Sequence, residues 1–259
     1  MDLGLRDRMI FIAGASQGIG AGIAESCLAE GARVAVAARG AEKLEAAATE
    51  WRARYGADAV YAIAADLRHA DAIEEAITRA EAALGPLFGA VANVGLTDCS
   101  QGFEITDDDW EAGLSQNLSS AFKLARASLH RMSARHEGSL LFITSIGGMR
   151  ALGAPLPYGA AKAGLNQMAR ELGASAGATG VRVNALAPGN ILFPGGNWER
   201  RLQGPQGQGW LKSIQREVPL GRFGEPKEIG DVAAFLLSPR ASYVNATTIV
   251  VDGGQTRVF

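Results

Sequence analysis

The stretch of sequence that decides the fold is Met9-Ile10-Phe11-Ile12-Ala13-Gly14-Ala15-Ser16-Gln17-Gly18-Ile19-Gly20. Its five apolar residues predict a buried strand, and the glycines that follow predict a tight turn into a helix. Glycines permit positive φ and let the backbone approach a pyrophosphate, while the N-terminus of the helix offers free N–H groups to the phosphates. We therefore expect a nucleotide site at this turn, formed by Gly14, Ser16, Gln17, Gly18, Ile19 and Gly20.

The glycines of this turn have the spacing G-x-x-x-G-x-G, which differs from the G-x-G-x-x-G fingerprint of dinucleotide-binding folds. A Walker A loop is excluded, because no Lys-Ser or Lys-Thr pair follows the glycines. A tight turn without a ligand is the alternative, so the function of this turn has to be judged from the rest of the chain.

Short apolar runs alternate with longer segments of helical period along the whole chain. Several of the apolar runs lack alternation, as expected for strands that are covered on both faces. The pattern predicts one α/β domain with a Rossmann-type, doubly wound parallel sheet of about seven strands. Strands are expected at 9–13, 33–38, 59–64, 88–92, 139–144, 182–186 and 248–251, and helices at 19–30, 41–55, 70–84, 107–135, 158–178 and 226–237.

Residues 190–215 break this rhythm, because they are rich in Gly and Pro and have no clean period. A loop of this length inside a compact domain is commonly functional, often as a lid. A disordered surface insertion is the alternative, although Trp198 and Trp210 are unusual in disordered segments. We expect a lid-like insertion within a single domain that spans residues 1–259.

Composition and charge narrow the classes of function. Of the 259 residues 47% are hydrophobic and 20% are charged, and the net charge is −2, so nothing favours general binding to nucleic acid or membrane surfaces. No apolar run is long enough for a signal sequence or a membrane span. His69, His130 and His136 are scattered, and Cys27 and Cys99 match no zinc pattern or disulfide framework. We expect a cytoplasmic protein without a metal site.

Arg39 comes directly after the second expected strand. A carboxylate at this place accepts the ribose 2′-OH of NAD, whereas an arginine pairs with a 2′-phosphate. Arg39 therefore favours NADP(H); NAD(H) stays open, and a solvated arginine is the alternative. Gln17 is neutral and adds no second cation. Asp66 and Asn93 follow the third and fourth strands at the edge where ligands bind, although either could be a turn residue.

A second group of polar residues follows the fifth expected strand. Ser145 comes directly after it, and Tyr158 and Lys162 lie four residues apart on one face of the next helix. A free tyrosine has a pKa of about 10, too high for a proton shuttle at neutral pH, and a nearby ammonium group lowers it. Without further context such a pair is more typical of a solvated helix face.

Taken together, these residues resemble the short-chain dehydrogenase/reductase family over nearly the whole chain, and its 3-oxoacyl-carrier-protein reductases in particular. Residues 14–20 resemble the cofactor turn of that family, residues 92–95 its Asn-Asn-Ala-Gly element with the first asparagine replaced, and Pro188-Gly189 its turn near the nicotinamide. The residues that match its catalytic tetrad in order and spacing are Asn117, Ser145, Tyr158 and Lys162.

The resemblance implies hydride transfer between NADP(H) and a carbonyl or secondary alcohol. Tyr158 would be the acid in reduction and the base in oxidation, and Lys162 would lower its pKa and bind the nicotinamide ribose. Ser145 would orient the substrate oxygen, and Asn117 would hold a water molecule. The cofactor would also contact Asp66, Leu67, Asn93, Gly95, Pro188, Gly189 and Ile191. The resemblance further implies a homo-oligomer, tetramer or dimer, built on the helices expected at 107–135 and 158–178.

Substrate selection is expected from Leu96 and from residues 146–156 and 193–210, which are mostly apolar or aromatic. This composition favours a hydrophobic or ring-bearing substrate, and Arg150 could receive an anionic group, although an exposed arginine is more common. Phe193 replaces the threonine that commonly bonds the nicotinamide carboxamide in this family; backbone groups near Ile191 could replace that contact. Two alternatives stay open: an NAD-dependent alcohol dehydrogenase of the same family, and a non-catalytic nucleotide-binding or scaffold protein.

Overall fold

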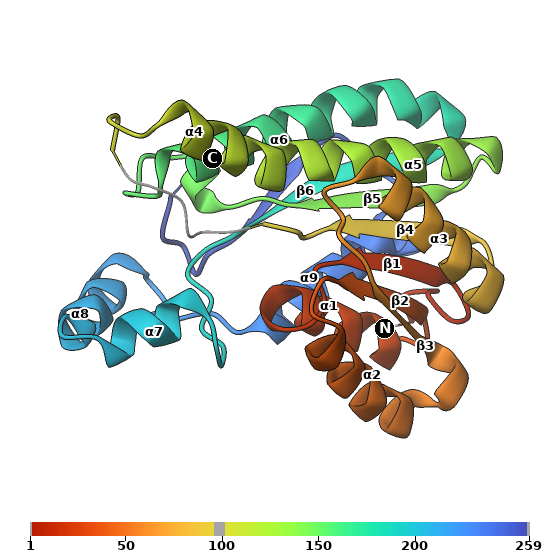
Figure 1. Ribbon diagram of the computed structural model, residues 1–259, viewed down its shortest axis with the longest axis horizontal. Helices are drawn as coiled ribbons and strands as arrows, with labels where there is room; N and C mark the ends of the chain where they lie inside the picture. Colours follow the sequence, from red (N-terminus) through yellow and green to blue (C-terminus); the bar gives the residue numbers. More distant parts are fainter. Residues whose placement is uncertain (1, 96–101, 258–259) are drawn as a thin grey trace.

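The computed structural model describes residues 2–95 and 102–257 (Figure 1). Its seven strands form one parallel sheet in the order β3-β2-β1-β4-β5-β6-β7. The strands are β1 (Met9–Ala13), β2 (Arg33–Ala38), β3 (Val60–Ala64), β4 (Leu87–Ala92), β5 (Gly138–Ile143), β6 (Val181–Pro188) and β7 (Thr248–Val251). The predicted α/β fold with a doubly wound sheet is confirmed, and the strand ends differ from the expected ones by at most two residues.

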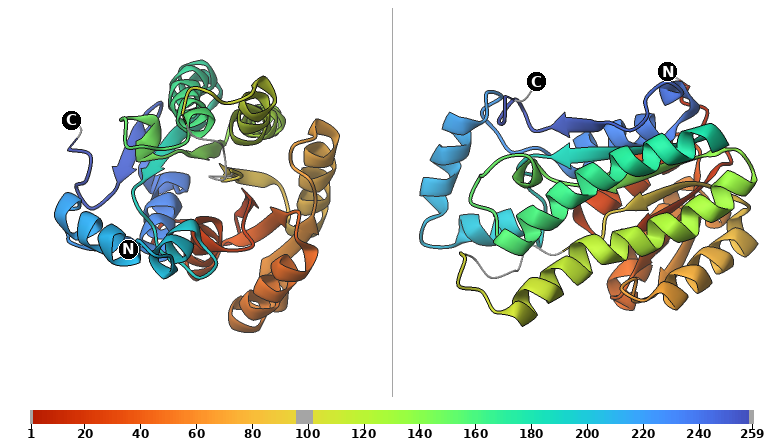
Figure 2. Two further views of the ribbon diagram at one scale, coloured as in Figure 1. Left: turned by 60° about the vertical axis from the view of Figure 1, so that its left-hand side comes forward. Right: turned by 90° about the horizontal axis from the view of Figure 1, so that it is seen from above.

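Helices cover both faces of the sheet (Figure 2). One face is covered by α3 (Ala70–Leu84), α5 (Ser120–Ala134) and α6 (Leu156–Ala176), and the other by α1 (Gly18–Ala29), α2 (Ala41–Tyr55) and α9 (Pro226–Leu237). Each face has its own hydrophobic cluster, because successive side chains of a strand point to opposite faces.

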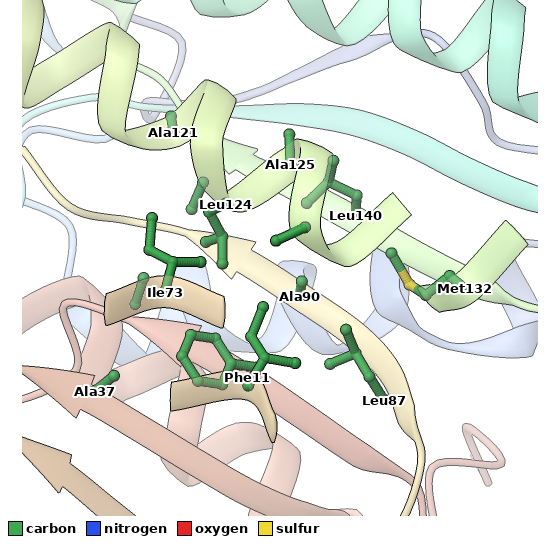
Figure 3. Packing of buried hydrophobic residues seen from close by; sticks show 14 of the residues in the cluster. Phe11, Ala37, Ile73, Leu87, Ala90, Ala121, Leu124, Ala125, Met132 and Leu140 are labelled. Atoms are coloured by element: carbon green, nitrogen blue, oxygen red, sulfur yellow. The ribbon is translucent and has the colours of Figure 1, made fainter. Parts of the chain in front are cut away.

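The alternation is clearest in β1. Phe11 packs with α3 and α5 on one face, whereas Ile10 and Ile12 pack with α1 and α9 on the other. Figure 3 shows Phe11, Ala90 and Leu140 of three neighbouring strands together with the side chains of the covering helices. Burying one such large apolar side chain contributes about 1.5–3 kcal/mol, which explains why the apolar runs of the sequence predict this sheet well.

The helix expected over residues 107–135 is interrupted, which corrects that prediction. It consists of α4 (Asp107–Leu114), a π-helical turn at Ser115–Ser119, and α5. Thr106 caps its start, since its Oγ1 accepts a hydrogen bond from the backbone N–H of Asp109 at 3.1 Å. Residues of a π turn keep helical φ and ψ, so apolar periodicity does not reveal it.

The segment 190–215 is not the irregular loop that its composition suggests. It contains α7 (Asn197–Gln203) and most of α8 (Gly207–Glu217), which lie at the left of Figure 1 beyond the strands. A separate small cluster, which includes Ile214, Val218 and Phe223, holds these helices. Leu211, Ile214 and Val218 recur at helical spacing, but this repeat continues past residue 215 and is therefore incomplete within the segment. Helix α7 has only two turns, which are too few to show a clear apolar period.

The connections of the sheet place a crevice at one edge. Strands β1 and β4 are neighbours, and the chain leaves them in opposite directions across the sheet. In doubly wound sheets ligands bind at this switch point, outside the carboxyl ends of the strands. The turns after β1, β4, β5 and β6 all meet there. In the described part of the chain, no helix has the length and apolar character needed to cross a membrane.

Candidate active site

A cavity of about 1100 Å³ opens at the carboxyl edge of the sheet. Three residues that were predicted to bind the cofactor lie outside the wall of this cavity. Gly18 lies beside Phe193, Gly20 is buried in α1, and Pro188 ends β6. Asn117 is fully buried behind the wall. The predicted residues that line the cavity are Gly14, Ser16, Gln17, Ile19, Arg39, Asp66, Leu67, Asn93, Gly95, Ser145, Tyr158, Lys162, Gly189 and Ile191.

The turn after β1 is shaped for close approach of a ligand. Gly14 has a φ of +80°, which favours glycine. A methyl group on Gly20 would lie 2.1 Å from the carbonyl oxygen of Gly14, so only glycine fits at that point. Asn93 braces the turn from the end of β4, because its Nδ2 donates to the same carbonyl oxygen at 2.7 Å. This arrangement and the free N–H groups at the start of α1 suit a pyrophosphate.

A second cation stands beside this turn, which the sequence did not reveal. Arg39 is exposed and lines the cavity as expected. The Nζ of Lys43, from the first turn of α2, donates to Oε1 of Gln17 at 3.0 Å. The turn itself has no cation, but the next helix supplies one. The only signal in the sequence was that Lys43 follows Arg39 by four residues.

Asp66 forms a fixed negative charge at the same end of the cavity. Its carboxylate accepts hydrogen bonds from Nε of Arg68 at 3.0 Å and from Nη2 at 2.6 Å. The side-chain hydrogen bond from Arg68 holds the pKa of Asp66 well below its usual range. Leu67 lies between the two charged residues in the chain and is buried.

Lys162 is the most constrained charge of the site. Its side chain is 4% exposed, and its Nζ donates to the carbonyl oxygen of Ile143, the last residue of β5, at 2.8 Å. Nζ lies 5.5 Å from the centroid of the Tyr158 ring. Burial lowers the pKa of Lys162 to about 8. The ammonium form therefore predominates at neutral pH, and the neutral amine predominates at alkaline pH.

Asn117 approaches Lys162 from the π-helical turn. Its Nδ2 donates to the carbonyl oxygen of Gly113 at 2.9 Å, and this bond fixes the orientation of the amide. A methyl group on Gly95 would come within 2.8 Å of Oδ1 of Asn117 and 3.2 Å of Nζ of Lys162. Gly95 therefore lies against both groups and leaves no room for a side chain there.

Ser145 lies two residues after the end of β5, on the Tyr158 side of the cavity. Its Oγ accepts a hydrogen bond from the backbone N–H of Gly147 at 3.0 Å, so its own hydrogen stays available for donation. A methyl group on Gly147 would lie 3.4 Å from Oγ of Ser145 and 4.0 Å from Cε1 of Tyr158. The hydroxyl and the phenol ring thus flank one small space. Helix α6 begins at Leu156, two residues earlier than expected.

The other end of the cavity is apolar and aromatic. Residues 152–155 line it, together with Trp198, Trp210 and Ile214 from α7 and α8. Leu96, which was expected here, lies outside the described residues, as does Cys99.

Arg150, which could have received an anionic group, does not line the cavity, as the alternative of an exposed arginine predicts. Arg150 is exposed, and its Nη2 donates to the carbonyl oxygen of Arg257 at 3.4 Å. Two other arginines, Arg200 and Arg201 of α7, do line it. The three histidines are exposed, as expected, and the described residues contain no cluster of His, Cys, Asp and Glu that could hold a metal ion.

Phe193 lies at the junction of the two ends. A methyl group on Gly18 would come within 2.6 Å of its ring, so the ring lies directly on the first residue of α1. Next to it, the backbone N–H of Leu192 donates to the carbonyl oxygen of Gly224 at 2.9 Å. The segment after β6 is thereby held between the glycine turn and the start of α9.

Comparisons with known proteins agree with this geometry. A family model described as enoyl-(acyl carrier protein) reductase matches residues 14–256. 2-(S)-hydroxypropyl-CoM dehydrogenase 3 of Xanthobacter autotrophicus is 31% identical over 98% of both chains. The 3-oxoacyl-[acyl-carrier-protein] reductase MabA of Mycobacterium tuberculosis is 32% identical over 96% of this chain and 92% of its own length. L-sorbose reductase from Gluconobacter frateurii, complexed with NADPH and L-sorbose, has a TM-score of 0.93 and 28% identity over both full chains.

The chain belongs to the short-chain dehydrogenase/reductase family, because the family match and these relatives extend over nearly its whole length. The resemblance of its motifs to that family is confirmed. The protein is an oxidoreductase of the type that acts on alcohol and carbonyl groups.

The buried amine of Lys162 makes stability depend on pH. Between pH 8 and 10.5 the unfolded chain, in which lysine has its ordinary pKa of 10.5, binds more protons than the folded chain. The free energy of unfolding of the cofactor-free protein should therefore rise with pH in this window, by about 3 kcal/mol relative to Lys162→Met, since one pKa unit corresponds to about 1.4 kcal/mol. Urea unfolding at a series of pH values measures the difference.

The matched control is Lys212→Met, because Lys212 is exposed on α8. It should leave the pH dependence of the wild-type protein unchanged. If the free energies of wild type and Lys162→Met stayed parallel from pH 7 to 10.5, the amine would not be buried as described.

Proposed function

We propose that the protein interconverts a carbonyl compound and a secondary alcohol with NADP(H) as cofactor, and that its substrate is hydrophobic or ring-bearing. The observation that carries the proposal is one cavity that joins the glycine turn after β1 to Ser145, Tyr158 and the buried Lys162. The cavity fits a dinucleotide, because the turn has the glycine cradle and helix N-terminus that a pyrophosphate requires. The nicotinamide ring supplies or accepts the hydride when the cofactor is bound.

The residues around Tyr158 provide the proton chemistry in this proposal. In carbonyl reduction, the phenol of Tyr158 gives its proton to the substrate oxygen, and in alcohol oxidation the phenolate takes it back. Ser145 donates its free hydrogen to the same oxygen and holds it in place. The ammonium group of Lys162 stabilises the phenolate and binds the nicotinamide ribose. Asn117 holds a water molecule that connects Lys162 to solvent.

The other residues in and beside the cavity wall divide the cofactor between them. Arg39 and Lys43 hold the 2′-phosphate, Asp66 and Leu67 contact the adenine, and Asn93 and Gly95 flank the ribose groups. The nicotinamide end lies against Pro188, Gly189 and Ile191. NAD(H) has no 2′-phosphate and would leave Arg39 and Lys43 without an anion to bind. The presence of these two cations therefore supports NADP(H) over NAD(H). A purely structural role for the fold is disfavoured, because it gives no reason to bury the charge of Lys162.

Two further features belong to the proposal. Helices α7 and α8 act as a lid over the substrate end, because they rest on their own small cluster and border the cavity. The chain assembles as a homo-oligomer, tetramer or dimer, through α5 and α6. Phe122 of α5 and Leu156 of α6 are exposed large apolar residues, and the alanines and glycines of α6 permit close helix contact.

Tyr158→Phe tests the reaction. Loss of the hydroxyl should lower the turnover of NADPH with any active carbonyl compound by about 10²–10⁴-fold, the usual contribution of a general acid, and should leave the fold intact. NADPH oxidation by a broad panel of ketones and aldehydes, followed by its absorbance, measures the effect. Tyr243→Phe is the control, because Tyr243 is fully exposed. Unchanged activity of Tyr158→Phe would refute the mechanism.

Arg39→Ala and Lys43→Ala test the cofactor. Each should weaken NADPH binding by about tenfold or more, as expected for the loss of a charge-assisted hydrogen bond, and should leave NADH binding nearly unchanged. Fluorescence titration of both reduced cofactors gives the dissociation constants. Arg33→Ala, at the opposite end of β2, is the control. A wild-type protein that bound NADH more tightly than NADPH would contradict this part of the proposal.

A further inference from the structure

An aromatic box with a cation in it lies at the substrate end of the cavity. The rings of Trp198 and Trp210 meet edge to face, with centroids 5.9 Å apart. The guanidinium carbon of Arg201 lies 5.0 Å from the Trp198 centroid and 5.4 Å from the Trp210 centroid. Phe223 supports Trp198 from behind at 5.2 Å. All three box residues line the cavity that also contains Tyr158.

The guanidinium group of Arg201 keeps its hydrogen-bond donors free. Across residues 2–95 and 102–257, no carboxylate lies within ion-pair distance of Arg201, and no acceptor receives a hydrogen bond from its side chain. A cation over an aromatic ring is attracted by the electrons of the ring, which accept no conventional hydrogen bond. The two indoles thus hold the guanidinium while its N–H groups form no hydrogen bond or ion pair with the described residues.

The other charges at this end do not cancel that cation. Arg200 is exposed on the same helix and also lines the cavity. Glu217 of α8 is the one carboxylate among the described lining residues near the lid. Its Oε1 already accepts from Oγ of Ser213 at 2.6 Å and from Nη2 of Arg216 at 3.3 Å. Among the described lining residues, no carboxylate therefore pairs with Arg201.

We propose that Arg201 is a specificity-determining residue that binds the carboxylate of a ring-bearing substrate, while the reacting carbonyl lies at Tyr158. The inference rests on the proposed function and narrows it, from a hydrophobic or ring-bearing compound to an aromatic keto or hydroxy acid. A planar guanidinium matches the two oxygens of a carboxylate, and the indole rings pack against the ring of the substrate. The carboxylate changes no bond, because hydride and proton go to the carbonyl carbon and oxygen.

A phosphate on a longer carrier group offers similar oxygens to an arginine. The cavity of about 1100 Å³ has to hold a dinucleotide together with the substrate, so it favours a compact acid over a long carrier. Arg201 is also half-buried and lies within 5.4 Å of both indole centroids. We therefore assign the anion to the substrate itself, and the experiment includes a carrier thioester as a separate arm.

Calorimetric titration tests the assignment without turnover. The probes are 4-acetylbenzoate and its uncharged analogue 4-acetylbenzamide, added to the protein with and without saturating NADP⁺, which cannot reduce a ketone. The wild-type protein should bind the acid about tenfold or more tightly than the amide, as expected for hydrogen bonds to a charged group. Arg201→Gln should remove this preference with less than a threefold change for the amide, and Arg201→Lys should retain part of it.

Arg216→Gln is the matched control, since Arg216 lies on α8 with a side chain that is 78% exposed and does not line the cavity. It should keep the full preference for the acid. Equal binding of acid and amide by the wild type, or an intact preference in Arg201→Gln, would overturn the inference. The third probe, acetoacetyl-CoA, is the carrier thioester. If Arg201→Gln weakened the binding of acetoacetyl-CoA alone, the anion would belong to a carrier and the inference would also be overturned. Failure of the proposed function would instead appear as no binding of NADP⁺, while the cofactor-free titration still reports on Arg201.

Discussion

The burial of one charge constrains the whole site. The ammonium group of Lys162 lies inside the protein and donates to the end of β5. Such a group is costly unless polar partners surround it. The groups close to it come from elements that are distant in sequence, since Ile143 ends β5, Asn117 lies in a π-helical turn and Gly95 follows β4. The neighbouring positions of β4 and β5 in the sheet bring them together, so the topology and the candidate chemistry are linked at this point.

The parts of the structure that follow from local sequence were predictable. Apolar runs such as that of β1 produce the strands, and the glycines after it produce the turn, because both depend on steric and burial effects within a few residues. The π-helical turn was not predictable, since its residues keep helical geometry. Two contacts also escaped prediction because they join segments that are not adjacent in the chain. Lys43 of α2 contacts Gln17, which precedes α1, and Arg201 of α7 lies beside Trp210 of α8. The two short helices α7 and α8 were not predicted either. Their apolar side chains pack in a small cluster of their own, so the segment does not show the apolar period of the helices that cover the sheet.

The division of the cavity explains how one fold can serve different substrates. The cofactor end is built from the turns of the sheet, which the family resemblance describes well. The proposed substrate end is built from α7 and α8, whose tryptophans and arginines are not part of any family motif recognised in the sequence. The two similar enzymes named above, a coenzyme M conjugate dehydrogenase and an acyl-carrier-protein reductase, are named for different substrates. Fold alone therefore does not identify the substrate, and the side chains of the lid have to be considered.

The central claim is that this cavity transfers hydride directly between a nicotinamide cofactor and a carbonyl carbon. The most direct measurement uses NADPH that carries deuterium at both C4 positions and the aromatic ketone of the panel that is reduced fastest. Mass spectrometry and NMR of the product then locate the label. The account predicts one deuterium on the carbinol carbon and none derived from solvent. A product without deuterium at that carbon, or a protein that binds NADPH but reduces no carbonyl compound, would contradict it.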